Sequence, residues 1–328
     1  MAASRATIVR AVAHPNIALA KYWGKKPGAG NIPAVPSLSV TLEGMKTTTT
    51  VAFDDALSAD HFILNGAEAV GDPLRRALGL LDRVRALSGE RRRARVTSDN
   101  DFPTTSGLAS SASGFAALAL AATRAAGLDL DASAVAGIAR ESSASAARSL
   151  FGGFAELDTN GVANAVAPAT QIDMRVLVCV TTDAQKAIGS TSGMNETAKI
   201  SPFYEAWLDR APRIYKDLRE ALLAKDFLIL GKCAEQSALA MHATALAAGI
   251  IYFNGVTQTV LAEVRKMRDE GIMVFATIDA GPHVKVLVRG SDAANAAERL
   301  AGVVGVLRVL KTRPGGAARV EAIKEGDA

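Results

Sequence analysis

The 328-residue sequence predicts an α+β protein, and three observations support this class. Short β-branched or alternating apolar runs, bounded by glycine, asparagine or proline, recur along the chain and are typical of strands. Longer alanine- and leucine-rich runs with capping residues at their ends are typical of helices. In the second half, closely spaced strands alternate with long helices, which favours antiparallel strands mixed with helices.

The first half is expected to contain most of the strands. In order, they lie at 7–13, 37–42, 47–53, 61–64, 95–98 and 152–157, with a mixed stretch at 16–23 and a turn-rich one at 24–30. Gly44, between two of these strands, predicts a hairpin. Asn65-Gly66 is a strong signal for a tight turn.

Helices are expected at 72–88, after a glycine/serine loop as far as about 126, and from 131 onward, followed by a serine-rich connector at 142–150. Asp72-Pro73 starts the first of them, because aspartate caps free N–H groups and proline suits the first helical position. Gly127 is expected to stop the second helix.

In the second half, the predicted elements are a strand at 174–181, a helix opening at Ser201-Pro202, a second helical run from 225–226 to about 242, a helix at 254–269, strands at 272–278 and 284–288, a helix at 293–300 and a strand at 304–310. The pattern changes near residues 170–182. We therefore expect an N-terminal domain over 1–180 and a C-terminal domain over 181–328.

Composition limits the classes of partner. The formal net charge of +4 and the pI near 9.1 suit anionic small molecules but are too mild to indicate nucleic acid. Cys179 and Cys233 lack metal-ligand spacing, so we expect small buried hydrophobes in a reducing compartment. Residues 1–12 lack the apolar core of a secretory signal, and no apolar run is long enough to span a membrane. The expected protein is cytoplasmic, with no membrane partner.

The stretch 103–113 places four serines around Gly107 and then runs into an alanine-rich segment. A glycine/serine loop at a helix start presents free backbone N–H groups at the positive end of the helix dipole, which attracts phosphate. Simple helix capping is the alternative. Since the Gly-x-x-x-x-Gly-Lys-Ser/Thr loop is absent, an ATP site here requires a different phosphate cradle.

Three more segments combine residues that carry chemistry. Lys21 and Lys25 can hold an anionic substrate or lie on a solvated helix edge. Arg148 follows alternating serines and can clamp a phosphate or carboxylate with two donors, or form a surface ion pair. Asp279 ends an apolar strand before Gly-Pro and can serve as a general base or simply initiate a turn. His283 fits a turn residue.

Taken together, these segments resemble the diphosphomevalonate decarboxylase family of the galactokinase/homoserine kinase/mevalonate kinase/phosphomevalonate kinase (GHMP) superfamily. The likeness runs in order from residue 10 to about 290. It is carried by Lys21-Tyr22-Trp23-Gly24-Lys25, the loop 107–112, the segment 143–153 and Asp279-Ala280-Gly281-Pro282. The resemblance implies an N-terminal domain like ribosomal protein S5 domain 2 and a ferredoxin-like C-terminal domain.

The resemblance also implies an activity. The family converts mevalonate 5-diphosphate and ATP into isopentenyl diphosphate, ADP, phosphate and carbon dioxide, using Mg²⁺, and a homodimer is expected. By this likeness Asp279 orients or deprotonates the tertiary hydroxyl of the substrate, and Lys21 keeps Asp279 ionised. Arg148 holds the substrate carboxylate and the developing phosphate charge.

The implied binding residues form two sets. Those for the substrate are Tyr22, Trp23, Gly24, Lys25, Arg75, Ser143, Ala144, Ser145, Ala146, Ala147, Arg148, Ser190, Thr191 and Met194. Those for ATP are Ser106, Gly107, Leu108, Ala109, Ser110 and Ser111, with Ser111 also at Mg²⁺.

Three other functions stay open: a decarboxylase acting on mevalonate 5-phosphate, a small-molecule kinase of the same superfamily, and an ATP-binding scaffold without catalysis. Tyr22, Lys25 and Arg75 favour a diphosphate, because more donors suit the extra charge. The presence of Lys21, Arg148 and Asp279 together argues against the scaffold.

Overall fold

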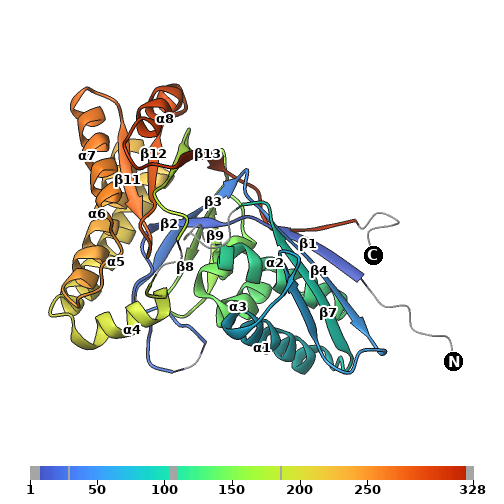
Figure 1. Ribbon diagram of the computed structural model, residues 1–328. Coiled ribbons are helices and arrows are strands. Elements are labelled where there is room, and N and C mark those ends of the chain that lie inside the picture. The colour runs from blue at the N-terminus through green and yellow to red at the C-terminus, as the bar shows by residue number, and fades with distance from the viewer. Residues whose placement is uncertain (1–7, 29, 103–109, 185–186, 323–328) are drawn as a thin grey trace.

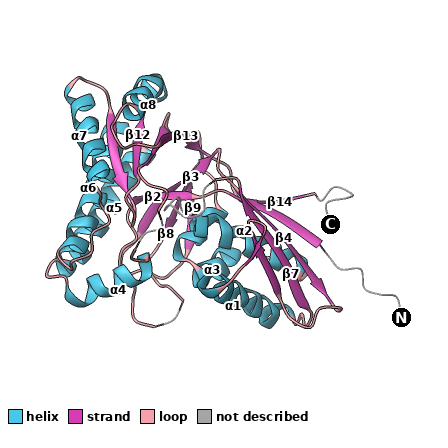
Figure 2. Ribbon diagram, in the orientation of Figure 1, coloured by secondary structure: helices cyan, strands magenta, loops and turns pink. Residues whose placement is uncertain are grey.

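The computed structural model describes residues 8–28, 30–102, 110–184 and 187–322. Two β-sheets and their covering helices make up this part of the chain (Figures 1 and 2). The predicted α+β class is therefore confirmed.

The first sheet that the described residues form has six strands in the order β14-β1-β4-β7-β5-β6. They are β1 (Ile8–Ala13), β4 (Thr47–Asp54), β5 (His61–Leu64), β6 (Ala67–Glu68), β7 (Arg93–Asn100) and β14 (Arg319–Glu321). Asn65 and Gly66 both have positive φ and join β5 to β6, as the sequence predicts.

Helices cover one face of this sheet (Figure 1). They are α1 (Gly71–Ser88), α2 (Ser110–Ala125) and α3 (Ala132–Ser142), followed by a 3₁₀ helix (Ala144–Leu150). The alanine-rich α2 packs on β1 and β4 below it and touches α1, α3 and the 3₁₀ helix. Its small side chains are almost all buried, and they allow this close approach from several sides.

The second sheet in the described residues has eight strands, in the order β11-β12-β10-β13-β3-β8-β9 with β2 paired to β3. They are β2 (Asn16–Ala20), β3 (Ser37–Glu43), β8 (Phe154–Leu157), β9 (Ala163–Ala167), β10 (Arg175–Val180), β11 (Val274–Ile278), β12 (Val284–Val288) and β13 (Arg308–Pro314).

Helices lie on both faces of the β10–β12 part of this sheet. They are α5 (Tyr204–Leu223) and α6 (Phe227–Leu246) on one face, and α7 (Gly255–Asp269) and α8 (Ala293–Ala301) on the other. Adjacent residues show the two faces: Val176 packs in the α5/α6 core, whereas Leu177 packs in the α7/α8 core. Burial on both faces explains the continuous apolar runs in these strands.

Pairing of β13 with β3 joins the two halves of the chain, with Arg313 opposite Glu43. Strand β10, which ends at Val180, pairs with β12 and β13. The predicted division at 180/181 stays a prediction.

Two local predictions are wrong. Strands β3 and β4 flank Gly44 but belong to different sheets, so there is no hairpin. β3 is buried on both faces inside the larger sheet, whereas β4 alternates between buried and half-buried residues. Asp72 does not cap α1, because Val70 is the N-cap residue and the Asp72 carboxylate instead binds Arg75 and Arg76.

Other elements differ in extent. The expected strand at 304–310 lies later, in β13, because a turn with Gly305 at φ +90° precedes it. The serine-rich connector at 142–150 is mostly a buried 3₁₀ helix. Patterns in the sequence did not indicate β9, β14 or the helix α4 (Ser190–Ile200).

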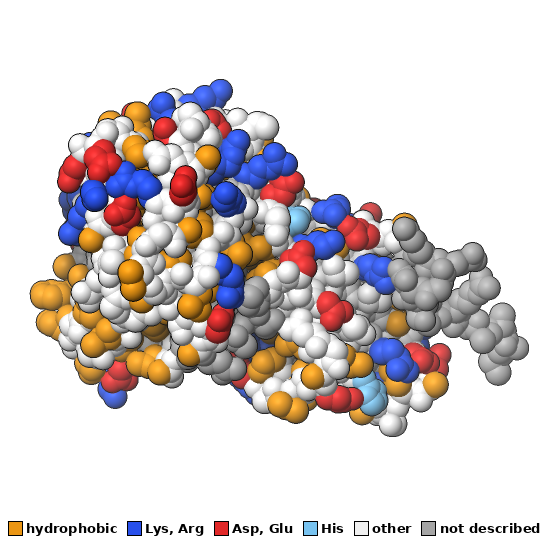
Figure 3. Space-filling model, turned by 45° about the horizontal axis from the view of Figure 1, so that its top comes forward, with side chains coloured by type: hydrophobic (Ala, Val, Ile, Leu, Met, Phe, Trp, Pro, Cys, Tyr) orange, Lys and Arg blue, Asp and Glu red, His pale blue; other side chains and the backbone are white. Residues whose placement is uncertain are grey.

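On the face seen in Figure 3, acidic and basic side chains are interspersed, and hydrophobic side chains gather at the lower left. Within the described residues, no helix is long and apolar enough to cross a membrane. Cys179 and Cys233 are both buried and free, as expected.

Gly231 allows α6 to lie directly on β11. A Cβ atom there would be 2.0 Å from the ring of Phe275. We expect Gly231→Ala to lower the free energy of unfolding by about 1–3 kcal/mol, because the helix must move off the strand. Gly137→Ala in α3 is the matched control, since its Cβ would meet nothing within 4 Å. Chemical denaturation of both variants tests this, and equal stability of the two would contradict it.

Candidate active site

The centre of the site is the carboxylate of Asp279, directly after β11. Its Oδ1 atom accepts a hydrogen bond of 2.6 Å from Lys21 Nζ, and its Oδ2 atom lies 3.2 Å from Lys285 Nζ. Lys21 follows β2, and Lys285 lies on β12. Both lysine side chains are almost completely buried, whereas the Asp279 side chain keeps 28% of its surface exposed. The carboxylate is therefore the accessible member of the cluster.

Electrostatics keep this carboxylate ionised. Burial alone would raise the pKa of Asp279, but the ammonium groups of Lys21 and Lys285 outweigh it and hold the pKa well below its usual value. For Lys21 burial has the larger effect and lowers its pKa to about 8, against the opposing attraction of Asp279. Lys285 and Arg148 lower it further. An excess of positive charge thus surrounds one carboxylate.

The pKa of Lys21 predicts the alkaline limit of activity. We expect kcat/KM to fall as pH rises through about 8, because Lys21 is charged below that pH and neutral above it. Steady-state kinetics over a pH series measure this limb. Lys21→Arg is the control: a guanidinium stays charged, so any activity that remains should not show the limb. If the wild type and Lys21→Arg show the same alkaline limb, the limb belongs to a group other than Lys21.

Arg148 approaches from the 3₁₀ helix. Its Nε donates to Ser39 Oγ at 2.5 Å and its Nη1 to Ser37 Oγ at 2.7 Å. The side chain is 2% exposed, and no described carboxylate lies within ion-pair distance of it, so the surface ion pair is excluded. Burial lowers the pKa of Arg148 to about 10, although Tyr22 and Asp279 oppose this shift. A buried guanidinium held only by hydroxyls is available to an anionic ligand.

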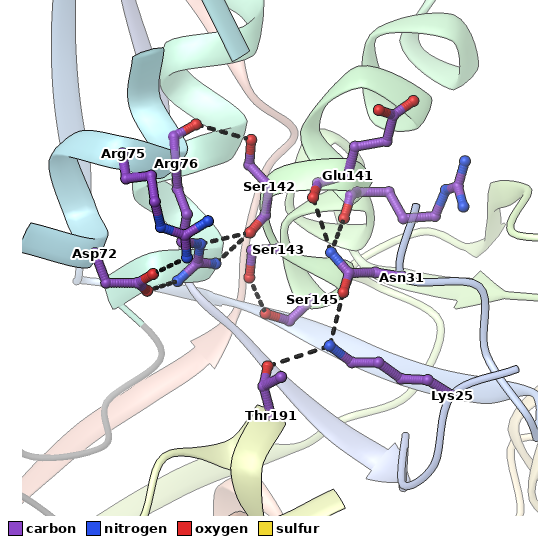
Figure 4. A network of polar contacts seen from close by, with 11 residues as sticks. Lys25, Asn31, Asp72, Arg75, Arg76, Glu141, Ser142, Ser143, Ser145 and Thr191 are labelled. Atoms are coloured by element: carbon purple, nitrogen blue, oxygen red, sulfur yellow. Dashed lines mark hydrogen bonds and ion pairs between the residues drawn. The ribbon is translucent and has the colours of Figure 1, made fainter. Parts of the chain in front are cut away.

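Figure 4 shows a second polar cluster, which includes Lys25 and the serines that precede Arg148 in the 3₁₀ helix region. Lys25 Nζ donates to Asn31 Oδ1 at 2.7 Å and to Thr191 Oγ1 at 3.2 Å, so it joins the first strand region to α4. The hydroxyls of Ser143 and Ser145 lie 3.2 Å apart. Burial lowers the pKa of Lys25. The predicted residues Lys25, Ser143, Ser145 and Thr191 are thus brought together.

Two arginines of α1 face the same cluster (Figure 4). Arg76 donates through both Nε and Nη2 to the carbonyl oxygen of Ser142, with 2.7 Å from Nε. Arg75 is mostly exposed and pairs with Asp72. Arg76 therefore holds the start of the serine segment, and Arg75, the preceding residue of α1, is held by Asp72.

Some of the residues predicted to bind the substrate pack in the core near the site. The side chain of Trp23 packs in the core against Tyr252, and its carbonyl oxygen accepts from the indole of Trp207. Met194 packs in the same core. The close backbone approach expected at Gly24 is to Tyr204, whose hydroxyl would lie 2.2 Å from an added Cβ atom.

The remaining predicted residues are placed as follows. Tyr22 is half-buried and donates to the carbonyl oxygen of Asn31, and Ser190 opens α4. Ala144, Ala146 and Ala147 are buried in the 3₁₀ helix. Ser106, Gly107, Leu108 and Ala109 lie outside the described residues, and Ser110 and Ser111 form the first turn of α2.

The sequence reasoning missed four contributors: Ser37, Ser39, Asn31 and Lys285. Two signals were available. Lys285 is a charge inside the apolar strand Val284–Val288, and Asn31 lies in a glycine- and proline-rich turn, where it adopts a positive φ of 54°. Ser37 and Ser39 alternate with apolar residues and give no signal beyond that of a strand. His283 is buried and contacts Thr181 rather than lying in an open turn.

The fold and the site together define a class: a two-domain α+β enzyme of the GHMP type, with a positively charged site for anionic ligands. Comparisons with known proteins are more specific. The model of the diphosphomevalonate decarboxylase-like N-terminal domain matches residues 13–166, and that of the mevalonate 5-diphosphate decarboxylase C-terminal domain matches residues 176–320. The chain belongs to the diphosphomevalonate decarboxylase family, as the four segments predict.

Individual relatives agree with this family. The chain is 32% identical to diphosphomevalonate decarboxylase of Candida albicans, over 83% of this chain and 81% of the relative. It is 34% identical to phosphomevalonate decarboxylase of Haloferax volcanii, over 84% and 86%. A solved structure described as "MDDEF in complex with MVAPP, AMPPCP and Magnesium" has a TM-score of 0.91 and 36% identity, covering 97% of this chain and 100% of that one.

Proposed function

We propose that this chain catalyses the ATP-dependent decarboxylation of mevalonate 5-diphosphate to isopentenyl diphosphate, and that Asp279, Lys21 and Arg148 act at the reacting atoms. The observation that carries this proposal is the accessible carboxylate of Asp279, held by buried lysines and close to a buried arginine for which no described carboxylate is within ion-pair distance. Family membership supports the reaction, and the complex with MVAPP, AMPPCP and magnesium supports ATP and Mg²⁺ as its requirements.

Asp279 contacts the tertiary hydroxyl of the substrate. A carboxylate with a pKa this low is a weak base but a permanent hydrogen-bond acceptor. It therefore orients the hydroxyl oxygen for attack and takes the proton only as that oxygen loses its basicity to a new bond. Lys21 keeps the carboxylate ionised and fixes its Oδ1 atom.

Arg148 binds the substrate carboxylate through the part of its guanidinium that Ser37 and Ser39 do not occupy. Because the side chain is buried and anchored, it holds the C–C bond that breaks in one orientation while carbon dioxide leaves. The same positive charge stabilises the departing phosphate.

The polar cluster of Figure 4 takes the diphosphate. Lys25, Thr191, Ser143 and Ser145 already converge there. Arg75 joins them by exchanging Asp72 for a phosphate oxygen, a small loss because the Asp72–Arg75 pair is exposed. The other residues of the proposed substrate set contribute backbone groups and packing contacts around the substrate. They are Tyr22, Trp23, Gly24, Ala144, Ala146, Ala147, Ser190 and Met194.

ATP and Mg²⁺ fit the start of α2. Ser110 and Ser111 lie in its first turn, and the Ser111 side chain is exposed. In the part of the chain that is described, no cluster of three His, Cys, Asp or Glu residues could hold a metal. Mg²⁺ beside a nucleotide takes oxygen ligands from the phosphates, from water and from a few protein groups, and the Ser111 hydroxyl is an oxygen of this kind. Magnesium-bound ATP supplies the phosphoryl group that turns the hydroxyl into a leaving group.

The test is incubation of the purified chain with ATP, Mg²⁺ and either mevalonate 5-diphosphate or mevalonate 5-phosphate. ADP, carbon dioxide and the organic product are measured together. We expect equal amounts of ADP and carbon dioxide and a preference for the diphosphate. ADP without carbon dioxide would indicate a kinase, preference for the monophosphate would reject the substrate, and ATP binding without turnover would indicate a scaffold.

Three further features are part of this proposal: a homodimer, a cytoplasmic location, and domains over 1–180 and 181–328. The two free buried cysteines support a reducing compartment. Light scattering of the purified chain tests the dimer.

A further inference from the structure

Lys285 is a lysine in an unusual place. It is the second residue of β12, where the other residues are valines and a leucine, and its side chain is only 1% exposed. Val284, Val286 and Val288 face the α7/α8 core, while Leu287 packs in the α5/α6 core on the opposite face. Because side chains alternate between the two faces of a strand, Lys285 lies on the same face as Leu287. Burying an ammonium group costs several kcal/mol unless a partner compensates.

Strand register brings Lys285 to its partner. Thr277 on β11 is directly opposite Lys285, and Asp279 follows two residues later on the same face. The distance from Lys285 Nζ to Asp279 Oδ2 is 3.2 Å. Among the described residues no other carboxylate is within ion-pair distance of Lys285, and the contact is an ion pair, since no described atom meets hydrogen-bond geometry with its Nζ atom.

The two lysines hold different oxygens of one carboxylate. Lys21 takes Oδ1 and Lys285 takes Oδ2, from two separate strand regions. With one lysine alone, the carboxylate can rotate about its Cβ–Cγ bond and still keep its partner. With both, the plane of the carboxylate is fixed.

We propose that Lys285 is a positioning residue, which fixes the plane of the Asp279 carboxylate so that the remaining lone pairs point at the substrate hydroxyl. This rests on the proposed function, in which Asp279 touches that hydroxyl. Lys285 acts through Asp279, whose Oδ2 atom lies 3.2 Å from its Nζ atom.

Other charged and titratable groups face this cluster from each neighbouring element. They are Lys21 after β2, Arg148 on the 3₁₀ helix, His242 on α6, and His283 beside β12, which Arg308 and Asp183 also influence. Burial lowers the pKa of His242 to about 3 and that of His283 to about 4. Both histidines are therefore neutral near pH 8, where Lys21 titrates.

The test is Lys285→Met, which keeps most of the length of the unbranched side chain and removes its charge. Asp279 retains Lys21, so no buried charge loses its last partner and we expect the protein to stay folded. We expect kcat to fall about tenfold to a hundredfold with KM for both substrates within about twofold, because orientation rather than binding is lost. Lys311→Met, at an exposed site on β13, which β10 separates from β12, is the matched control.

A second readout separates positioning from general stability. Lys285 lowers the pKa of Lys21, so removing it should move the alkaline limb of kcat/KM to higher pH. If Lys285 had only a structural role, its replacement would change the melting temperature but would not shift the alkaline limb of kcat/KM. Unchanged kcat together with an unmoved limb would overturn the proposal. Lys285→Gln repeats the measurement if the methionine variant does not fold.

A double-mutant cycle tests whether Lys285 acts through Asp279. On an Asp279→Asn background, Lys285→Met should cause a smaller further loss of kcat than on the wild type. Equal losses on both backgrounds would overturn the proposal. The two proposals fail separately: normal turnover of Asp279→Asn rejects the proposed function, whereas an inactive Asp279→Asn with a fully active Lys285→Met rejects only the role of Lys285.

Discussion

Replacing Asp279 by asparagine is expected to lower kcat by about a thousandfold or more, because the reaction loses its permanent acceptor for the hydroxyl proton. Asparagine has nearly the same shape, so the substrates should still bind. The side-chain amide cannot take up the proton, and one of its two ends is a donor that faces a lysine. Steady-state kinetics with ADP and carbon dioxide as readouts measure the effect.

Folding needs a control in this experiment. Asp279→Asn leaves Lys21 and Lys285 buried without a counter-charge, which destabilises the protein unless one of them gives up its proton. Circular dichroism and thermal melting show whether the variant is folded at the assay temperature. Asp173→Asn is the matched variant, since that aspartate forms an exposed pair with Arg175. Turnover near the wild-type rate in a folded Asp279→Asn protein would remove Asp279 from its role.

Arg148→Lys is expected to reduce kcat/KM by about a hundredfold, although the charge is conserved. The guanidinium donates from Nε to Ser39 and from Nη1 to Ser37, and its other N–H groups remain available to an anion. A lysine has one nitrogen and cannot make both anchoring contacts while it also holds a carboxylate. The orientation of the breaking C–C bond is therefore lost along with binding.

The control for this variant is Arg124→Lys at the end of α2, where the arginine is paired with Asp129 outside the site. It should leave kcat/KM unchanged. An Arg148→Lys protein with the wild-type kcat/KM would show that a point charge is enough there. Loss of activity in both variants would point to a general effect on the fold instead of a clamp.

Local chemistry explains what the sequence predicts well. The Asn65-Gly66 turn, the strand Val284–Val288 and the helix at 255–269 after Asn254 depend on neighbouring residues, because turn dihedrals, strand patterns and capping boxes are local properties. The same holds for Asp279 at a strand end. The four motifs add the family, which the comparisons confirm.

Long-range packing explains what the sequence does not predict. Gly44 is a reasonable hairpin signal, but β3 and β4 pair with partners far along the chain and enter different sheets. Aspartate is a residue type that often caps helices, but two arginines one turn further along α1 bind the Asp72 carboxylate instead. The first outcome is not visible in a window of neighbouring residues, because strand pairing is decided over the whole sheet, whereas the second is a local competition along one helix.

By itself the sequence determined the α+β class, the family and the residue types that bring charge to the site: Lys21, Lys25, Arg148 and Asp279. Only the tertiary structure decided which charges meet. The register between β11 and β12 places Lys285 on the second oxygen of Asp279, and the fold of β3 under the 3₁₀ helix places two serines on Arg148. The physical reason is that the interaction of charges depends on distance and burial, and tertiary packing sets both, bringing together residues as far apart in the sequence as Lys21 and Asp279.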